Sequence, residues 1–293
     1  MTTLADTLDP AGVSALAELL AGRRVVVLAG AGCSTESGIP DYRGPGSAGR
    51  RRQPMTYQEF VGGEAARARY WARSAVGWPR MAAARPNPAH FALSRLEEGG
   101  VVRGIITQNV DGLHHAAGSR RVVELHGSLA WVRCLQCGAR VERDAFQDRL
   151  YETNVAWAEW VRSVAMVGEA ESNPDGDVEL PSWAVEGFRV PPCGACGGVL
   201  KPVIVFFGEN VPRERVDEAW RLYEEGEVLL VVGSSLTVWS GRRFVDRAVR
   251  EGVPVAVVNI GPTRADEFAA LKVEARVGRV LPAIADVLSG RAA

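Results

Sequence analysis

Two pairs of cysteines constrain the fold of this chain most strongly: Cys134-Leu-Gln-Cys137 and Cys193-Gly-Ala-Cys196. A gap of two residues lets both sulfurs of a tight turn face one ion, and zinc prefers four such ligands in a tetrahedron. Glycine follows each pair, as a turn of this kind requires. Four protein ligands leave no open position on the metal, so the sequence predicts a structural zinc ion, with a rubredoxin-like iron site as the alternative.

The composition of the 293-residue chain is ordinary for a globular protein, with 47% hydrophobic and 24% charged residues. Because 34 basic residues balance 35 acidic ones, we expect no direct binding to nucleic acid. Asp6, Asp9 and Glu18 argue against a targeting peptide, and apolar runs such as 228–232 are too short to span a bilayer. We therefore expect a cytoplasmic protein with no membrane association, in which paired cysteines bind metal rather than form disulfides.

The fold class follows from apolar, β-branched runs that alternate with helical stretches. Val25-Val-Val-Leu-Ala29 is typical of a strand that is covered on both faces of a parallel sheet. Similar runs cover 101–107, 227–233 and 253–260, and helical stretches cover 211–226 and 240–252. This alternation predicts an α/β fold with a doubly wound, Rossmann-like parallel sheet, into which a smaller zinc-binding module (131–202) is inserted.

A glycine-rich turn follows the first of these strands. Gly30-Ala31-Gly32 suits the close approach of backbone N–H groups to a pyrophosphate, because glycine has no side chain to block it. The turn departs from the G-x-G-x-x-G pattern, since Thr35 stands at the third glycine position. We therefore predict a dinucleotide site that differs from that of a hydride-transfer dehydrogenase. The thiol of Cys33 within the turn is interpreted as a small buried side chain rather than a nucleophile.

Polar side chains follow two further strands. Thr107-Gln-Asn-Val-Asp111 ends one strand, so its amides and carboxylate lie at the carboxyl edge of the sheet, where such sheets bind ligands. Asp111 is also a candidate cap for the next helix. His126 follows another apolar run, and a neutral imidazole there can accept a proton at cellular pH. His90, after the predicted N-cap Asn87, is interpreted as a packing or capping residue.

These motifs resemble those of the sirtuin family of NAD-dependent protein deacylases. The agreement extends from about residue 20 to 283, with the motifs in the family's order. The matching segments are 30–43, 107–114, 126–127, both cysteine pairs, 201–209, 233–236 and 259–261. The resemblance implies a Rossmann-like NAD-binding domain (1–43, 88–130 and 203–293), a cofactor loop with a helical module (44–87) and a zinc-binding module (131–202).

The resemblance also implies roles for individual residues, with NAD as a co-substrate. His126 takes a proton from a ribose hydroxyl, and Gln108 and Asn109 orient that ribose. Further cofactor contacts are assigned to Gly30, Ala31, Gly32, Ser34, Ile39, Asp41, Tyr42, Arg43, Asp111, Gly233, Ser234, Ser235, Asn259, Ile260, Gly261 and Val277. An extended acylated peptide is expected to pair with the backbone of Val205, Phe206, Phe207 and Gly208.

The implied reaction removes an acyl group from a protein lysine, consumes NAD and releases nicotinamide and O-acyl-ADP-ribose. A protein mono-ADP-ribosyltransferase, which uses the same cleavage of NAD, is the alternative. A non-enzymatic interaction module would tolerate loss of His126, whereas this chain has His126 together with Gln108, Asn109 and Asp111. The sequence therefore favours an enzyme.

Within the family the chain resembles the class II, lipoamidase-type branch in segments 70–73, 77–79, 206–207, 239–241 and 261–266. Tyr57 is followed three residues later by Phe60 rather than arginine, which removes support for a succinyl substrate. The run Arg50 to Arg52 is interpreted as a solvated loop rather than a binding site for an acidic acyl end. We therefore expect a preference for uncharged acyl chains longer than acetyl.

Overall fold

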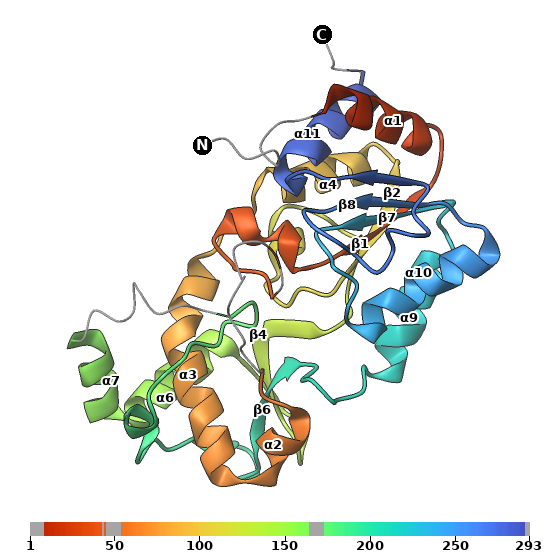
Figure 1. Cartoon of the computed structure of the whole chain (residues 1–293). Helices are drawn as coiled ribbons and strands as arrows, with labels where there is room; N and C mark the ends of the chain where they lie inside the picture. The colour runs from red at the N-terminus through yellow and green to blue at the C-terminus, as the bar shows by residue number, and fades with distance from the viewer. Residues whose placement is uncertain (1–8, 43, 45–53, 164–172, 291–293) are drawn as a thin grey trace.

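The computed structural model describes residues 9–42, 44, 54–163 and 173–290 of the chain. These residues form a large part around a parallel sheet and a smaller part that carries the cysteine pairs (Figure 1). Among the described residues, no helix is both long and apolar enough to cross a membrane.

Six strands form the central sheet in the order β3-β2-β1-β7-β8-β9. Their bounds are β1 (Val25–Ala29), β2 (Val102–Thr107), β3 (Val122–Glu124), β7 (Val228–Val232), β8 (Val255–Val258) and β9 (Leu271–Val273). Every neighbouring pair is parallel. The chain starts in the middle of the sheet, extends it to one edge and then to the other, which confirms the doubly wound topology.

Helices from the described residues cover both faces of the sheet, with one set on each face (Figure 1). The first set comprises α1 (Pro10–Leu20), α4 (Pro88–Glu98) and α11 (Val277–Leu288), and the second comprises α9 (Arg213–Tyr223) and α10 (Trp239–Glu251). Alternate residues of β1 divide between the two cores, with Val25 and Val27 on the first side and Val26 and Leu28 on the second. Because both faces are buried, the strand is apolar throughout its length.

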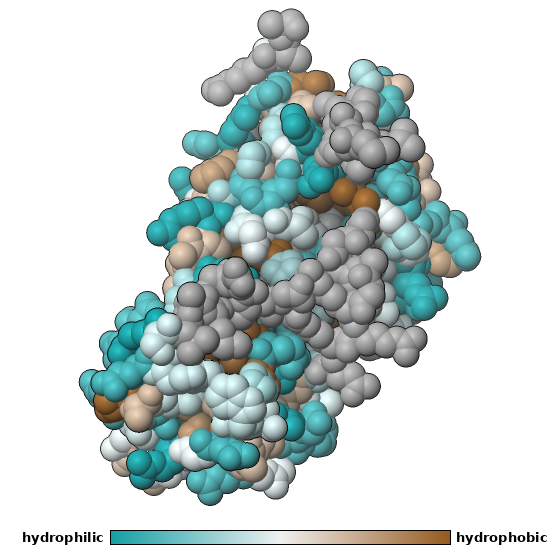
Figure 2. Space-filling model, turned by 60° about the vertical axis from the view of Figure 1, so that its left-hand side comes forward, coloured by the Kyte–Doolittle hydropathy of each residue, from teal (hydrophilic) through white to brown (hydrophobic). Residues whose placement is uncertain are grey.

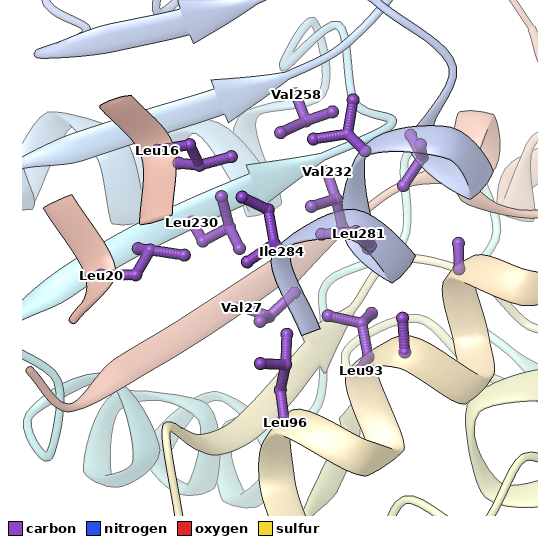
Figure 3. Packing of buried hydrophobic residues seen from close by; sticks show 14 of the residues in the cluster. Leu16, Leu20, Val27, Leu93, Leu96, Leu230, Val232, Val258, Leu281 and Ile284 are labelled. Atoms are coloured by element: carbon purple, nitrogen blue, oxygen red, sulfur yellow. The ribbon is translucent and has the colours of Figure 1, made fainter. Parts of the chain in front are cut away.

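The core beneath α1, α4 and α11 is built from interdigitating aliphatic side chains (Figure 3). Leu16, Leu93, Leu281 and Ile284 extend from these helices toward the sheet. The helix α4 begins as the sequence predicted, because the Asn87 side chain accepts the N–H of Ala89 at 2.9 Å. His90 Nδ1 in turn accepts the backbone N–H of Asn87 at 3.3 Å, which confirms its capping role.

The smaller part, as far as its residues are described, combines an antiparallel sheet in the order β5-β4-β6 with several helices. Its elements are β4 (Gly127–Cys134), β5 (Arg140–Glu142), β6 (Leu200–Ile204), α2 (Tyr57–Gly62), α3 (Glu64–Ala83), α6 (Arg143–Thr153) and α7 (Val155–Ser163). The smaller part also contains the short 3-10 helix η5 (Ser182–Val185), and the larger part contains the short helices η2 (Ala31–Cys33), η3 (Thr35–Ser37) and α5 (Leu113–Ala116).

The helical segment and the cysteine-bearing segment share one core. Trp71 of α3 is fully buried, its indole N–H donates to the carbonyl of Leu200 at 3.2 Å, and its ring lies 4.7 Å from that of Phe146. The strands β4 and β6 also continue across the expected boundaries at 130/131 and 202/203. The division into three segments therefore remains a prediction.

The visible surface in Figure 2 is largely hydrophilic, and hydrophobic residues show there as small separate patches. Exposed aromatic side chains occur on both parts, for example Trp183 at 59% and Trp239 at 65% exposure. Trp239 also lines the main cavity, which lies at the carboxyl ends of the central strands.

Candidate active site

A cavity of about 1240 Å³ lies at the carboxyl ends of four central strands. The residues that follow these strands line it, namely Gly30 after β1, Gln108 after β2, Gly233 after β7 and Asn259 after β8. Open α/β sheets bind ligands at this edge, where the strand order reverses. Because pockets for small-molecule ligands measure roughly 300–1,000 Å³, the cavity can hold a dinucleotide together with a second group.

The glycine turn packs directly against the backbone that follows β7. The N–H of Gly32 donates to the carbonyl of Gly233 at 2.8 Å. A Cβ on Gly30 would lie 2.7 Å from that carbonyl oxygen, and a Cβ on Gly32 would lie 2.9 Å from the Cα of Gly233. The sequence suggested that these glycines let backbone N–H groups approach a pyrophosphate. In the structure they allow two loops to pack closely, and the N–H of Gly32 is already bonded to the protein.

A network of side-chain hydrogen bonds links three loops on the cavity floor. The amide of Asn109 donates to Ser34 Oγ at 3.1 Å, and that hydroxyl donates to the carboxylate of Asp111 at 2.7 Å. Gln108 donates to Ser234 Oγ at 2.9 Å. Burial raises the pKa of Asp111, and its other oxygen accepts the N–H of Leu113, as a helix cap would. The residues predicted around the ribose are therefore brought together.

His126 is held with a defined tautomer between β3 and β4. Its Nδ1 lies 3.0 Å from the carbonyl oxygen of Gln108, which can only accept, so Nδ1 carries the proton. Its Nε2 lies 2.7 Å from Ser240 Oγ and therefore accepts. Burial lowers the pKa of His126 to about 4, although the Gln108 carbonyl opposes this shift. The imidazole is therefore neutral at cellular pH. The lone pair of its Nε2 points to Ser240, which lines the cavity.

Ser240 and Arg243 of α10 also line the cavity, and sequence reasoning did not assign them to the site. In the sequence, the segment Trp239-Ser-Gly241 carries only a family resemblance. Gly241 lies so close to the side chain of Gln108 that an added Cβ would be 2.5 Å from its Oε1. The sequence signal that could have placed Ser240 in the site is the serine–glycine pair, which lies at the start of a helix that follows a strand.

The other predicted cofactor contacts divide into several groups. Ile39, Asp41 and Tyr42 line one end of the cavity, and Asp41 accepts the N–H of Gly44 at 2.6 Å. Ala31, Ser235, Ile260 and Gly261 line it as well. Val277 is buried in the core at the start of α11 and does not line the cavity, so its contact with adenosine remains a prediction. Arg43 and the run Arg50 to Arg52 lie outside the described residues.

The predicted peptide segment continues from β6 along the cavity wall. The carbonyl of Phe207 accepts the N–H of Tyr57 at 2.9 Å. The N–H of Phe206 donates to the carboxylate of Glu209 at 2.9 Å, and this carboxylate pairs with Lys201 at 3.0 Å. These bonds hold the segment in place, and they occupy part of the backbone that was expected to pair with a peptide.

The four paired cysteines come together at one end of the smaller part. The Sγ atoms of Cys134 and Cys196 lie 3.5 Å apart, those of Cys137 and Cys193 lie 3.8 Å apart, and all four lie within 4.8 Å of one another. Sulfurs bound 2.3 Å from one zinc ion lie about 3.8 Å apart. The donor set and its spacing therefore fit a closed, structural zinc site.

Cys33, His90 and His114 form a second buried cluster of potential metal ligands. Because His90 Nδ1 accepts the N–H of Asn87, its Nε2 carries the proton and offers no lone pair to a metal. Burial raises the pKa of the Cys33 thiol and lowers the pKa of both histidines, that of His90 to about 4. The cluster consists of three neutral groups, and we interpret it as packing.

Comparisons with known proteins agree with this geometry. A family model described as "Sir2 family" matches residues 30–240. A protein of Xanthomonas campestris pv. campestris (strain 8004), named NAD-dependent protein deacetylase, is 52% identical over 259 residues, which are 88% of this chain and 86% of that protein. NAD-dependent protein deacetylase 1 of Streptomyces coelicolor (strain ATCC BAA-471 / A3(2) / M145) is 49% identical over 276 residues, covering 94% and 90%.

A solved structure described as "Sir2-p53 peptide-NAD+" superposes with a TM-score of 0.74. It is 31% identical to this chain, and the match covers 95% of this chain and 98% of the other. The fold therefore has a counterpart over nearly the whole length of the chain. This protein belongs to the Sir2 family, the sirtuins.

Proposed function

We propose that this protein is an NAD-dependent protein-lysine deacylase that releases nicotinamide and O-acyl-ADP-ribose. The observation that carries the proposal is the neutral imidazole of His126, whose proton is held on Nδ1 by the Gln108 carbonyl. Its Nε2 is then free of a proton at the edge of a cavity large enough for NAD and an acyl-lysine side chain. The names of the bacterial relatives support the same activity.

NAD, when bound, supplies the ribose carbon from which nicotinamide departs. The residues of this chain bind and orient it: the amides of Gln108 and Asn109 extend from fixed positions at the end of β2. His126 then accepts a ribose hydroxyl proton at Nε2, which lets that oxygen attack the acyl carbon. Ile39, Asp41 and Tyr42 are assigned to the nicotinamide end, and the loop after β8 to the adenosine end. The buried network of Asn109, Ser34 and Asp111 keeps this geometry without a mobile side chain.

The products distinguish the two activities that this site can support. Incubation with NAD and an acetyl-lysine peptide, followed by mass spectrometry, is expected to give free lysine peptide and O-acetyl-ADP-ribose in equal amounts. A protein or peptide target that instead gains the mass of ADP-ribose, with the acetyl group retained, would identify a mono-ADP-ribosyltransferase. A reaction without NAD consumption would contradict both.

The finer proposal is a class II sirtuin with a preference for uncharged acyl chains longer than acetyl, acting in the cytoplasm on acylated proteins. The wall near the peptide segment is apolar, since Ile39, Met55, Ile204, Phe206 and Phe207 line it. Ile204 and Phe206 are each only 5% exposed, whereas Phe207 is 37% exposed and lies edge-on to Tyr42 with ring centroids 6.0 Å apart. Of the two phenylalanines in this wall, Phe207 is therefore the one that an acyl chain can contact more extensively.

A panel of acetyl, succinyl, octanoyl and lipoyl peptides tests this preference. We expect kcat/KM to be highest for an uncharged long chain, because each buried methylene contributes roughly 0.8 kcal/mol. Phe207→Ala should reduce the long-chain rate more than the acetyl rate, with Trp183→Ala as an exposed aromatic control in η5, outside the cavity. A preference for succinyl in the wild-type protein would contradict the proposal.

A further inference from the structure

Ser240 contacts the same imidazole nitrogen that the proposed reaction uses. Its Oγ lies 2.7 Å from His126 Nε2, and because Nδ1 holds the proton, the serine hydroxyl is the donor in this bond. Both residues line the cavity. A hydroxyl that donates one hydrogen bond keeps two lone pairs, so Ser240 can accept a second hydroxyl while it remains bonded to Nε2.

The turn that carries Ser240 is fixed by contacts that do not involve His126. In the first turn of α10, the N–H groups of Gly241 and Arg242 bond to the carbonyl of Val238 at 3.2 and 3.1 Å. The guanidinium Nε of Arg243 donates to the carbonyl of Ser240 at 3.1 Å. Gly241 fits against the amide of Gln108, the residue whose carbonyl holds the other side of the imidazole. The hydroxyl is therefore presented by a rigid helix start.

We propose that Ser240 is a positioning and proton-relay residue for His126, an inference that rests on the proposed deacylase function. In the relay, the ribose O–H bond breaks as its proton moves to Ser240 Oγ. At the same time the original Oγ–H bond of Ser240 breaks, and the serine's own proton moves to His126 Nε2. The serine hydroxyl is restored and the imidazole gains one proton. The ribose oxygen keeps the electron pair with which it attacks the acyl carbon.

The surroundings of His126 favour its neutral form from several sides. Burial is the largest cause of its low pKa, and Arg215 of α9 and Arg243 of α10 add repulsion against an imidazolium. Glu124, at the end of β3, interacts with Arg215 and has its own pKa raised by burial to about 7. The Ser240 hydroxyl donates to Nε2 of the neutral imidazole and can turn to accept from the imidazolium, so its removal should change the pKa of His126.

The test compares Ser240→Ala with Ser240→Thr, which keeps the hydroxyl, and with Ser14→Ala, an exposed helix serine of α1. For Ser240→Ala we expect deacylation kcat to fall roughly tenfold, the effect of one lost hydrogen bond, with little change in the KM for NAD. Exchange of labelled nicotinamide into NAD should be unchanged, because it precedes the proton transfer. Ser240→Thr should retain most of the activity, and Ser14→Ala should behave as the wild-type protein.

A second readout is the titration of His126 by NMR, which is practical because the chain has only four histidines. The signal is assigned by its loss in His126→Asn, and the His126 pKa in Ser240→Ala should differ from that in the wild-type protein. A wild-type rate with an unchanged His126 pKa would overturn the proposal. Equal losses of deacylation and nicotinamide exchange would also overturn it, since they would indicate a distorted cavity. An inactive wild-type protein would contradict the proposed function instead, while the titration would still decide whether Ser240 holds the imidazole.

Discussion

The backbone N–H of Val205 donates a 2.8 Å hydrogen bond to the carbonyl of His126. The proposed base and the proposed peptide segment are thus joined directly, at the point where β4 pairs with the end of β6. Gly127 makes this junction possible, because its φ is 84° and an added Cβ would clash with the carbonyl of Val203. A peptide bound along 205–208 would therefore lie in a fixed position relative to the imidazole.

Gly127→Ala should lower both stability and activity. The new methyl group meets backbone rather than a flexible side chain, and the residue needs a left-handed conformation. We therefore expect the free energy of unfolding to fall by at least about 1–3 kcal/mol. Gly62→Ala is the control, since a Cβ there meets nothing within 4 Å. Urea unfolding measures both variants, and equal stability of the two would refute the role given to Gly127.

Cys134→Ser should remove zinc and lower stability by several kcal/mol, because in a closed site the energy of metal binding is energy of folding. Cys33→Ala should keep one zinc per chain, since Cys33 belongs to the neutral cluster with His90 and His114. Elemental analysis and thermal unfolding give both answers. Two zinc ions per wild-type chain, with one lost in Cys33→Ala, would show that the second cluster binds metal.

Gly241→Ala should impair use of NAD with little effect on stability. The added Cβ would displace the side-chain amide of Gln108, a flexible group, away from Ser234. Misplacement of an orienting group by about 1 Å can cost up to 100-fold in rate, so we expect a lower kcat/KM for NAD and a nearly unchanged melting temperature. Steady-state kinetics that match those of the wild-type protein would show that Gln108 does not orient the ribose.

The pH dependence of deacylation should reflect the low pKa of His126. The neutral imidazole is the active form, so activity is present above its pKa of about 4 and is lost as the pH falls through that value. An unperturbed histidine would lose activity near pH 6.5 instead. Because Glu124 has a pKa of about 7, its titration could be mistaken for that of a histidine, and Glu124→Gln removes it. An acid limb near 6.5 that persists in this variant would contradict the burial argument.

Much of this architecture could be predicted from local sequence patterns. The run Val25-Val-Val-Leu-Ala29 and the Asn87-Pro88 cap determine their own elements through burial and hydrogen bonding over a few residues. The spacing of the cysteines within each pair likewise predicts a shared ion. These features depend on contacts between neighbours in the chain, so the sequence is sufficient to infer them.

Other features depend on contacts between distant segments and could not be predicted in this way. The pairing of Ser240 with His126 joins residues 114 positions apart, and the close packing of Gly32 on Gly233 joins two loops across the sheet. Neither relation has a local pattern in the sequence. The shared core of α3 and α6 is of the same kind, because it arises only when Trp71 meets Phe146.

The central claim is that the neutral His126 acts on a ribose hydroxyl after nicotinamide has left. The most direct test measures deacylation and labelled-nicotinamide exchange in parallel for His126→Ala, with the exposed His115→Ala as the control. We expect His126→Ala to lose at least about 100-fold in deacylation while it still binds NAD and exchanges nicotinamide. Deacylation by His126→Ala at the wild-type rate would contradict the role of His126 as the base.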